Sequence, residues 1–160
     1  FTRLDTRFGY KVTGRNGLDI TTAWANGMRT MHGMFTNGFP NMFMVQPEQG
    51  AMFAACITMD SANNCLKLGA VISEAEKRGA REVEVHPEAQ EKWMGLLAMN
   101  PGGGILFDAE CTPGYYNKEG GEPTLEEMLN VTGYPFGSVA FFQADRAWRE
   151  SGEFEGLVFA

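Results

Sequence analysis

The sequence is poor in the residues that build cross-links and metal sites. Its 160 residues include three cysteines, Cys56, Cys65 and Cys111, and two histidines, His32 and His86. No cysteine pair has CxxC spacing and neither histidine has a carboxylate at ligand spacing, which argues against a disulfide framework and against a metal site. We expect reduced thiols, His32 packed within a strand, and His86 in a surface turn.

Positive charge and long apolar runs are also scarce. Thirteen Lys and Arg against twenty Asp and Glu give a formal net charge of -7. Because such a chain repels phosphates and anionic surfaces, we expect it to bind neither nucleic acid nor membranes. No apolar stretch approaches the roughly 20 residues of a transmembrane helix. Residues 1–7 carry no signal-peptide core, so a cytoplasmic location is expected.

The phosphate-binding motifs of nucleotide enzymes are missing. The chain has no GxGxxG, no GxxxxGK[ST] and no nucleophile elbow. The three glycines at 102–104 follow a helix pattern, whereas a phosphate loop follows a strand, and we interpret them as a linker. The chain therefore does not itself supply a phosphate-cradling turn. It opens on Phe1 without an initiator Met, and we expect it to begin inside a longer polypeptide.

What is present is the composition of a globular α/β segment. Hydrophobic residues make up 44% and charged residues 21% of the chain, which also has 20 Gly and 10 Met. The methionines favour ordinary core filling over an adaptable cavity wall. Four apolar residues at 42–45, between turn signals, are typical of a strand buried on both faces. The patterns predict strands over residues 7–12, 30–34, 42–45, 82–85 and 154–159, and helices over 19–26, 51–78, 87–100 and 138–150.

These elements divide the chain into three parts. Residues 1–100 contain strands and helices, and residues 137–160 contain a helix, capped by Ser138, and a closing strand. Between them, residues 101–136 hold most of the prolines and many glycines. Irregular stretches of that length inside domains are usually functional or disordered. The acidic clusters at 126–127 and 153–155 are expected to be solvated faces, because paired carboxylates need a concave, partly dry setting for acid–base work.

Four segments carry a resemblance to a known family. Residues 24–33 read Trp-Ala-Asn-Gly-Met-Arg-Thr-Met-His-Gly and residues 38–45 read Gly-Phe-Pro-Asn-Met-Phe-Met-Val. They resemble the W-x-x-G-[PM]-R-T-x-x-G and G-F-P-N-L-F segments of the C-terminal part of the Baeyer-Villiger monooxygenases, which are class B flavin-dependent monooxygenases. Residues 111–117, Cys-Thr-Pro-Gly-Tyr-Tyr-Asn, are similar to a segment of one branch of the family, and residues 152–159 resemble the family's C-terminal end.

The resemblance covers nearly the whole chain and implies the C-terminal portion of a Rossmann-like FAD/NAD(P)-binding domain with a long, irregular control-loop region. It implies an enzyme that uses FAD, NADPH and O2 to insert oxygen beside the carbonyl of a small-molecule ketone. In the family, the glycine-rich fingerprints and the active-site Arg lie upstream of the matching segment. The upstream part of the same polypeptide would then be this chain's partner, and the chain alone would hold no catalytic residue.

The resemblance also suggests which residues approach the cofactors. Ligands of open α/β sheets bind where strands end, so the turn after the apolar strand is the cofactor-side candidate: Gln46, Pro47, Glu48, Gln49 and Gly50. Many family members have a small, Gly- and Ser-rich loop there, and an ordinary strand–helix turn is the alternative. In the control loop, stacking and hydrogen bonding to nicotinamide would fall to residues that replace a Trp found in many members: Tyr115, Tyr116 and Asn117.

Two alternative functions stay open at this point. An N-hydroxylating or sulfoxidising flavin monooxygenase of the same superfamily would share the fold and differ in substrate. A non-catalytic binding module with an acidic, Met-lined pocket would be favoured if Phe1 lay close to a natural N-terminus.

Overall fold

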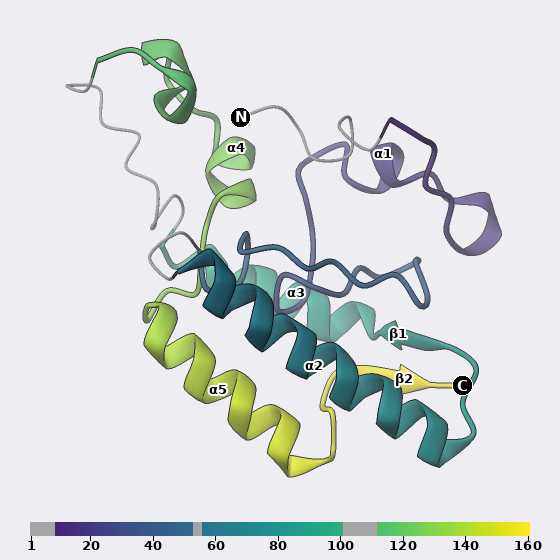
Figure 1. Cartoon of the computed structure of the whole chain (residues 1–160). Coiled ribbons are helices and arrows are strands. Elements are labelled where there is room, and N and C mark those ends of the chain that lie inside the picture. Colours follow the sequence, from purple (N-terminus) through teal and green to yellow (C-terminus); the bar gives the residue numbers. More distant parts are fainter. Residues whose placement is uncertain (1–8, 53–55, 101–111) are drawn as a thin grey trace.

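The computed structural model describes residues 9–52, 56–100 and 112–160. Most of the elements in these segments are helices, with one short strand between α2 and α3 and another at the end of the chain. Figure 1 shows the two long helices α2 and α5 side by side. The 102–104 glycines and Cys111 lie outside the described residues. In chain order the elements are η2 (Arg15–Gly17), α1 (Ile20–Ala23), α2 (Ile57–Arg78), β1 (Val83–Val85), α3 (Pro87–Leu97), η3 (Tyr115–Gly120), α4 (Leu125–Asn130), α5 (Ser138–Ser151) and β2 (Leu157–Phe159).

Helix α2 confirms most of the long helix predicted from the sequence. It starts at Ile57, later than the predicted residue 51. It stops at Gly79, which has a φ of 65° and whose N–H donates to the last turn, as expected of a left-handed glycine cap. Lys77 and Arg78 precede it in the last turn, where positive charge opposes the helix dipole. No helix in the described segments is long and apolar enough to cross a membrane.

Of the other helices, α1 and α3 begin within the ranges predicted for them, whereas α4 lies in residues 101–136, which were expected to be irregular. Asp19 accepts a hydrogen bond from the N–H of Thr21 and so caps α1, and Pro87 occupies the start of α3. The prediction that Ser138 caps the last helix is wrong. Gly137 precedes α5 as its N-cap residue, and Ser138 is already its first helical residue.

The strands β1 and β2 form a two-stranded antiparallel sheet, with Val83 opposite Phe159 and Val85 opposite Leu157. They confirm, in shorter form, the strands predicted at 82–85 and 154–159. Antiparallel pairing brings the end of the chain onto the segment between α2 and α3 (Figure 1).

Three predicted strands do not form in the described residues. Residues 30–34 and 42–45 contribute only isolated bridges, Met31 to Phe35 and Phe35 to Phe43, and in residues 9–12 no strand forms. The reason at 30–34 is a reversal of the chain: His32 has a φ of 56° and Gly33 a φ of 70°, which no extended strand can contain. His32 therefore lies in a turn, not in a strand. Val45 is 47% exposed, so residues 42–45 are not buried on both faces.

Several methionines lie in the core. One buried cluster joins the 31–35 turn to α2, β1 and the segment before β2, and a second surrounds α1. Met28, Met31 and Met34 are buried in these clusters, which confirms the core-filling interpretation. The clusters consist of Met31, Met34, Phe35, Val71, Val83, Val85 and Phe154, and of Ile20, Trp24, Met28 and Phe39. Between them runs the segment that leads to residues 46–50.

Candidate functional site

Residues 46–50 form a tight loop, called here the 46–50 loop, whose central side chain points inward. Gln49 is wholly buried. Its Nε2 donates to the carbonyl of Met28 at 2.8 Å and to that of Leu129 at 3.2 Å, and its Oε1 accepts from Thr30 Oγ1 at 2.7 Å. Because both ends of the amide are used inside the protein, Gln49 shapes the loop and does not present its side chain outward.

The backbone of the loop is fixed by further hydrogen bonds from distant segments. The N–H of Gln49 donates to the carbonyl of Thr132 at 2.8 Å, and the carbonyl of Gln49 accepts from Trp93 Nε1 at 3.0 Å. Gly33 lies so close that a Cβ there would be 2.5 Å from the carbonyl oxygen of Glu48. These contacts hold a loop in which Gln49 has a left-handed φ of 55°.

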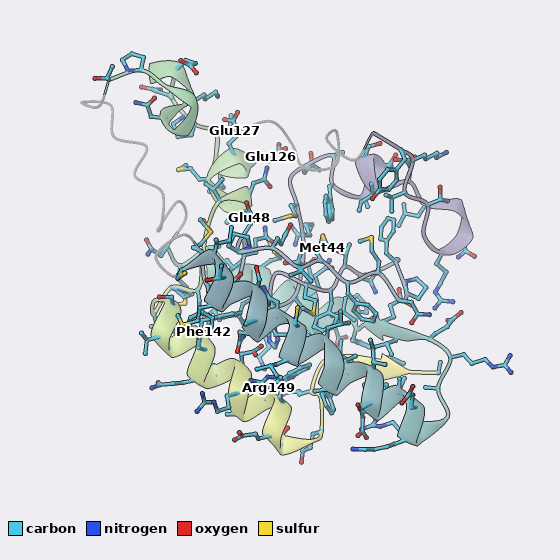
Figure 2. All side chains as sticks on the ribbon, viewed as in Figure 1. Met44, Glu48, Glu126, Glu127, Phe142 and Arg149 are labelled. Carbon is cyan, nitrogen blue, oxygen red and sulfur yellow. The ribbon has the colours of Figure 1, made fainter. Side chains whose placement is uncertain are left out.

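Helix α2 contacts the opposite end of the loop. Asn64 Nδ2 donates to the carbonyl of Gln46 at 3.2 Å, and Gln46 Nε2 lies 3.3 Å from the sulfur of Met28. Gln46, Pro47 and Glu48 are half-buried, and Gly50 is buried. Figure 2 places Glu48 near the start of α2. The loop therefore presents Gln46, Pro47 and Glu48 as its accessible part.

The second group of candidate residues lies in another part of the chain. Residues 115–117 begin η3, which Figure 1 shows standing beyond α4 and away from α2 and α5. Asn117 is buried, and its side chain accepts from the N–H of Gly114 at 2.7 Å and donates to the carbonyl of Thr112 at 3.0 Å. For Tyr115 and Tyr116 only the backbone is described. Asn117 thus shapes its own turn.

A buried ionic cluster between α2 and α5 was not found from the sequence. Lys67 Nζ lies 2.7 Å from Asp145 Oδ1, and the two side chains are 0% and 1% exposed. Asp145 also pairs with Arg149 at 3.2 Å and accepts from Asn63 at 2.9 Å. A signal existed: α2 buries Asp60, Asn64, Lys67 and Val71, four residues at the spacing of one helix face. Polar residues at core spacing indicate a buried network.

Burial shifts the pKa values of Asp60, Lys67 and His32, which lie in or beside this cluster. It raises the pKa of Asp60 to about 6; nearby Glu48 and Asp145 raise it too, while Lys67 acts in the opposite direction. Burial also lowers the pKa of Lys67, against the attraction of Asp145. The pKa of His32 lies well below its usual value because of burial and then of Lys67, so its imidazole is neutral.

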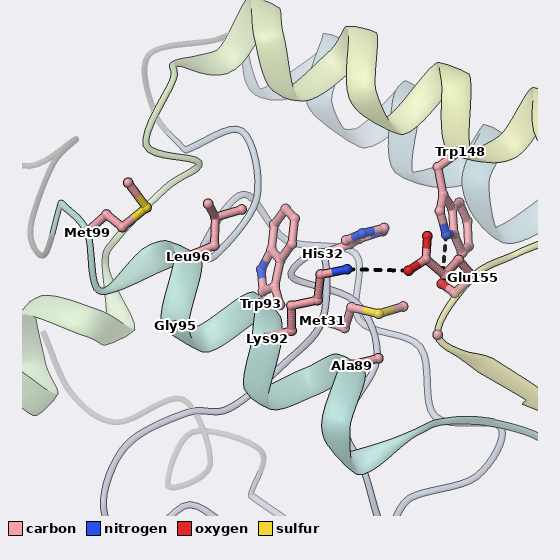
Figure 3. A pocket seen from close by; sticks show the side chains of 11 residues that line it. Met31, His32, Ala89, Lys92, Trp93, Gly95, Leu96, Met99, Trp148 and Glu155 are labelled. Atoms are coloured by element: carbon pink, nitrogen blue, oxygen red, sulfur yellow. Dashed lines mark hydrogen bonds and ion pairs between the residues drawn. The ribbon is translucent and has the colours of Figure 1, made fainter.

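Figure 3 shows a mostly apolar cavity of about 440 Å³ that is lined in part by His32, whose carbonyl lies 3.5 Å from Lys67 Nζ of the cluster. His32 contacts Trp93 and Trp148 edge-on, with ring centroids 4.6 and 5.1 Å away. Lys92 and Glu155 form an exposed ion pair of 3.4 Å beside the cavity (Figure 3). Trp93 links the cavity wall to the 46–50 loop through its bond to Gln49. In the described residues no His, Cys, Asp and Glu group could hold a metal ion.

No family model matches the chain. Curated proteins do match it: the chain is similar to an FAD-binding monooxygenase of Hypomyces subiculosus, with 36% identity over 96% of this chain and 25% of that protein. It is also similar to a Baeyer-Villiger monooxygenase of Streptomyces coelicolor, with 40% identity over 87% of this chain and 22% of that protein.

A solved structure gives the same result for the fold. The polycyclic ketone monooxygenase of Thermothelomyces thermophila superimposes on the chain with a TM-score of 0.84 and 27% identity, covering 98% of this chain and 25% of that one. The fold is therefore the α/β fold of flavin-dependent monooxygenases. Within that class, the resemblance to the Baeyer-Villiger monooxygenases is confirmed over nearly the whole chain. The chain spans about a quarter of the length of these relatives.

Proposed function

We propose that the chain is the C-terminal part of the FAD-binding domain of an NADPH-dependent monooxygenase that inserts oxygen beside a ketone carbonyl. One observation carries this proposal: the 40% identity to a Baeyer-Villiger monooxygenase over most of the chain. The polycyclic ketone monooxygenase shares its fold, and its name supports a ketone as substrate. The rest of the enzyme is supplied by the upstream part of the same polypeptide, since the chain matches only a quarter of its relatives.

The 46–50 loop fits an uncharged part of FAD better than its phosphates. Its accessible groups are the Gln46 amide, the Pro47 ring and the Glu48 carboxyl, and Asp60 lies close to Glu48. Two acidic groups repel a pyrophosphate, whereas amides and backbone groups suit the heteroatoms of a flavin ring. The phosphates are therefore held by upstream residues, in agreement with the missing glycine-rich motif.

The proposed role of this segment is to bind the flavin and to shield it from water. When bound, the flavin supplies the oxygen-transfer chemistry. Gln46, Pro47 and Glu48 hold its ring side, while Gln49 keeps the loop in shape through its buried amide. The inward side chain of Gln49 also accommodates a departure from the small, Gly- and Ser-rich loop of the family, because Gln49 does not protrude from the outer surface of the loop. A cytoplasmic location is part of the proposal, because three cysteines without CxxC spacing favour reduced thiols.

Residues 112–117 are the proposed control-loop contribution to NADPH binding: Tyr115 and Tyr116 approach the nicotinamide, and Asn117 holds their turn through its bonds to Gly114 and Thr112. Deleting residues 112–117 in the full-length polypeptide is expected to raise the KM for NADPH more than it lowers FAD content. The control replaces the exposed Glu119 and Glu122 of the same region with Ala. Equal losses of FAD retention and NADPH use after the deletion would contradict a nicotinamide-specific role.

A further inference from the structure

The buried face of α2 next to the 46–50 loop carries a polar pair that the proposed chemistry does not use. Asp60 and Asn64 are 1% and 2% exposed. Asn64 Nδ2 donates to Asp60 Oδ2 at 3.0 Å and to the carbonyl of Gln46 at 3.2 Å. One amide hydrogen of Asn64 thus bonds within the helix, to Asp60, and the other bonds to the loop. The other oxygen of Asp60, Oδ1, is buried and has no hydrogen-bond partner among the described residues.

The protonation state of Asp60 decides how Asn64 is oriented. An ionised carboxylate can only accept hydrogen bonds, so it holds the NH2 group of Asn64 toward itself and toward Gln46. A protonated carboxyl can instead donate to the amide oxygen of Asn64, and the amide can then turn its NH2 group away from the loop. The hydrogen bond to the loop is thus firmest when Asp60 is ionised.

The charges around Asp60 determine the pH at which its carboxyl ionises. Lys67 on α2 favours the ionised form, while Glu48 of the loop and Asp145 on α5 disfavour it. Arg149 on α5 pairs with Asp145 and so reduces that repulsion. Together with burial these groups raise the pKa of Asp60 to about 6, so the carboxyl changes state just below neutral pH.

We propose that Asp60 is a positioning residue for flavin binding, which acts by aiming Asn64 at the backbone of Gln46 and so fixing the outer end of the 46–50 loop. The inference rests on the proposed function of that loop and deepens it. Asp60 touches neither cofactor nor substrate in this account. Its effect on flavin affinity passes through one hydrogen bond, and it depends on pH.

The test measures FAD affinity of the full-length polypeptide by flavin fluorescence from about pH 5 to about pH 8, a range that spans the titration of Asp60. In the parent protein, affinity is expected to rise with pH by about five- to tenfold, the contribution of one buried hydrogen bond. Asp60→Asn removes the titration and is expected to flatten this profile. Asn64→Ala is expected to weaken FAD binding by a similar factor at the upper end of the range.

The matched control is Asn63→Ala, which removes the neighbouring amide of α2 that bonds to Asp145 and not to the loop. It is expected to keep both the affinity and the pH profile of the parent. Two results would overturn the inference while leaving the flavin-binding function intact. One is a pH dependence of FAD affinity that persists in Asp60→Asn, and the other is equal FAD affinity in Asn63→Ala and Asn64→Ala. Absence of flavin binding by the parent protein at every pH would instead refute the proposed function and the inference with it.

Discussion

Replacing Lys67 with Met tests the buried ionic cluster that holds α2 against α5. The Lys67 side chain is fully buried, 2.7 Å from Asp145, and its Nζ also lies 5.0 Å from the centre of the Phe141 ring. Met fills nearly the same volume without a charge, so Lys67→Met leaves no large cavity. What it leaves is a buried Asp145 without its closest cation.

The size of the effect follows from what remains around Asp145. Removing one partner of a buried ion pair costs roughly 3 to 5 kcal/mol. Asp145 keeps Arg149 at 3.2 Å and Asn63 at 2.9 Å, so we expect the low end of that range, about 3 kcal/mol.

Hydrogen exchange of α2 amides in the full-length polypeptide measures this free energy locally. The control is Lys77→Met on the same helix, whose partner Glu74 is 3.5 Å away at the surface, and it should leave protection unchanged. Adding Asp145→Leu to Lys67→Met is expected to recover part of the loss, because an apolar pair can replace a buried ionic one. A loss below about 1 kcal/mol, or no recovery in the double variant, would refute the reasoning.

Two further predictions concern the loop and the start of α2. Gly33→Ala places a Cβ within 2.5 Å of a backbone oxygen at a φ of 70°, and is expected to destabilise the protein by at least about 2 kcal/mol in a denaturation experiment. Gly69→Ala is the control, because a Cβ at Gly69 meets open space, and it is not expected to destabilise the protein. Equal losses of stability in the two variants would contradict the close contact described at Gly33. The hydroxyl and backbone N–H of Thr58 lower the pKa of the Cys56 thiol, so iodoacetamide is expected to alkylate Cys56 several-fold faster than Cys65 at neutral pH. Equal rates would contradict this.

Much of the fold was predictable because its signals are local. Pro87 at a helix start, Asp19 as a cap and Gly79 as a left-handed terminator each act within a single turn of chain. The strands predicted at 30–34 and 42–45 failed because apolar runs alone do not reveal a chain reversal. The turn at His32 comes with edge-on ring contacts to Trp93 and Trp148 and with the close approach of Gly33 to the 46–50 loop, which are contacts between distant residues.

The candidate site was predictable only in outline. The sequence pattern and the family resemblance pointed to the 46–50 loop, but the inward side chain of Gln49 depends on partners at Met28 and Leu129 that are remote along the chain. The pairing of Lys67 with Asp145 joins two helices, so neither helix alone identifies the partner residue. The polar stripe on α2 could have indicated that such a partner exists, but not which residue it is.

The most direct test of the account is to express the full-length polypeptide that carries this chain and measure what it binds and makes. The account predicts a protein that retains FAD and, with O2, couples the oxidation of NADPH to the conversion of a ketone into an ester or lactone. A protein that retains no flavin and oxidises no NADPH, with ketone or without, would contradict the central claim.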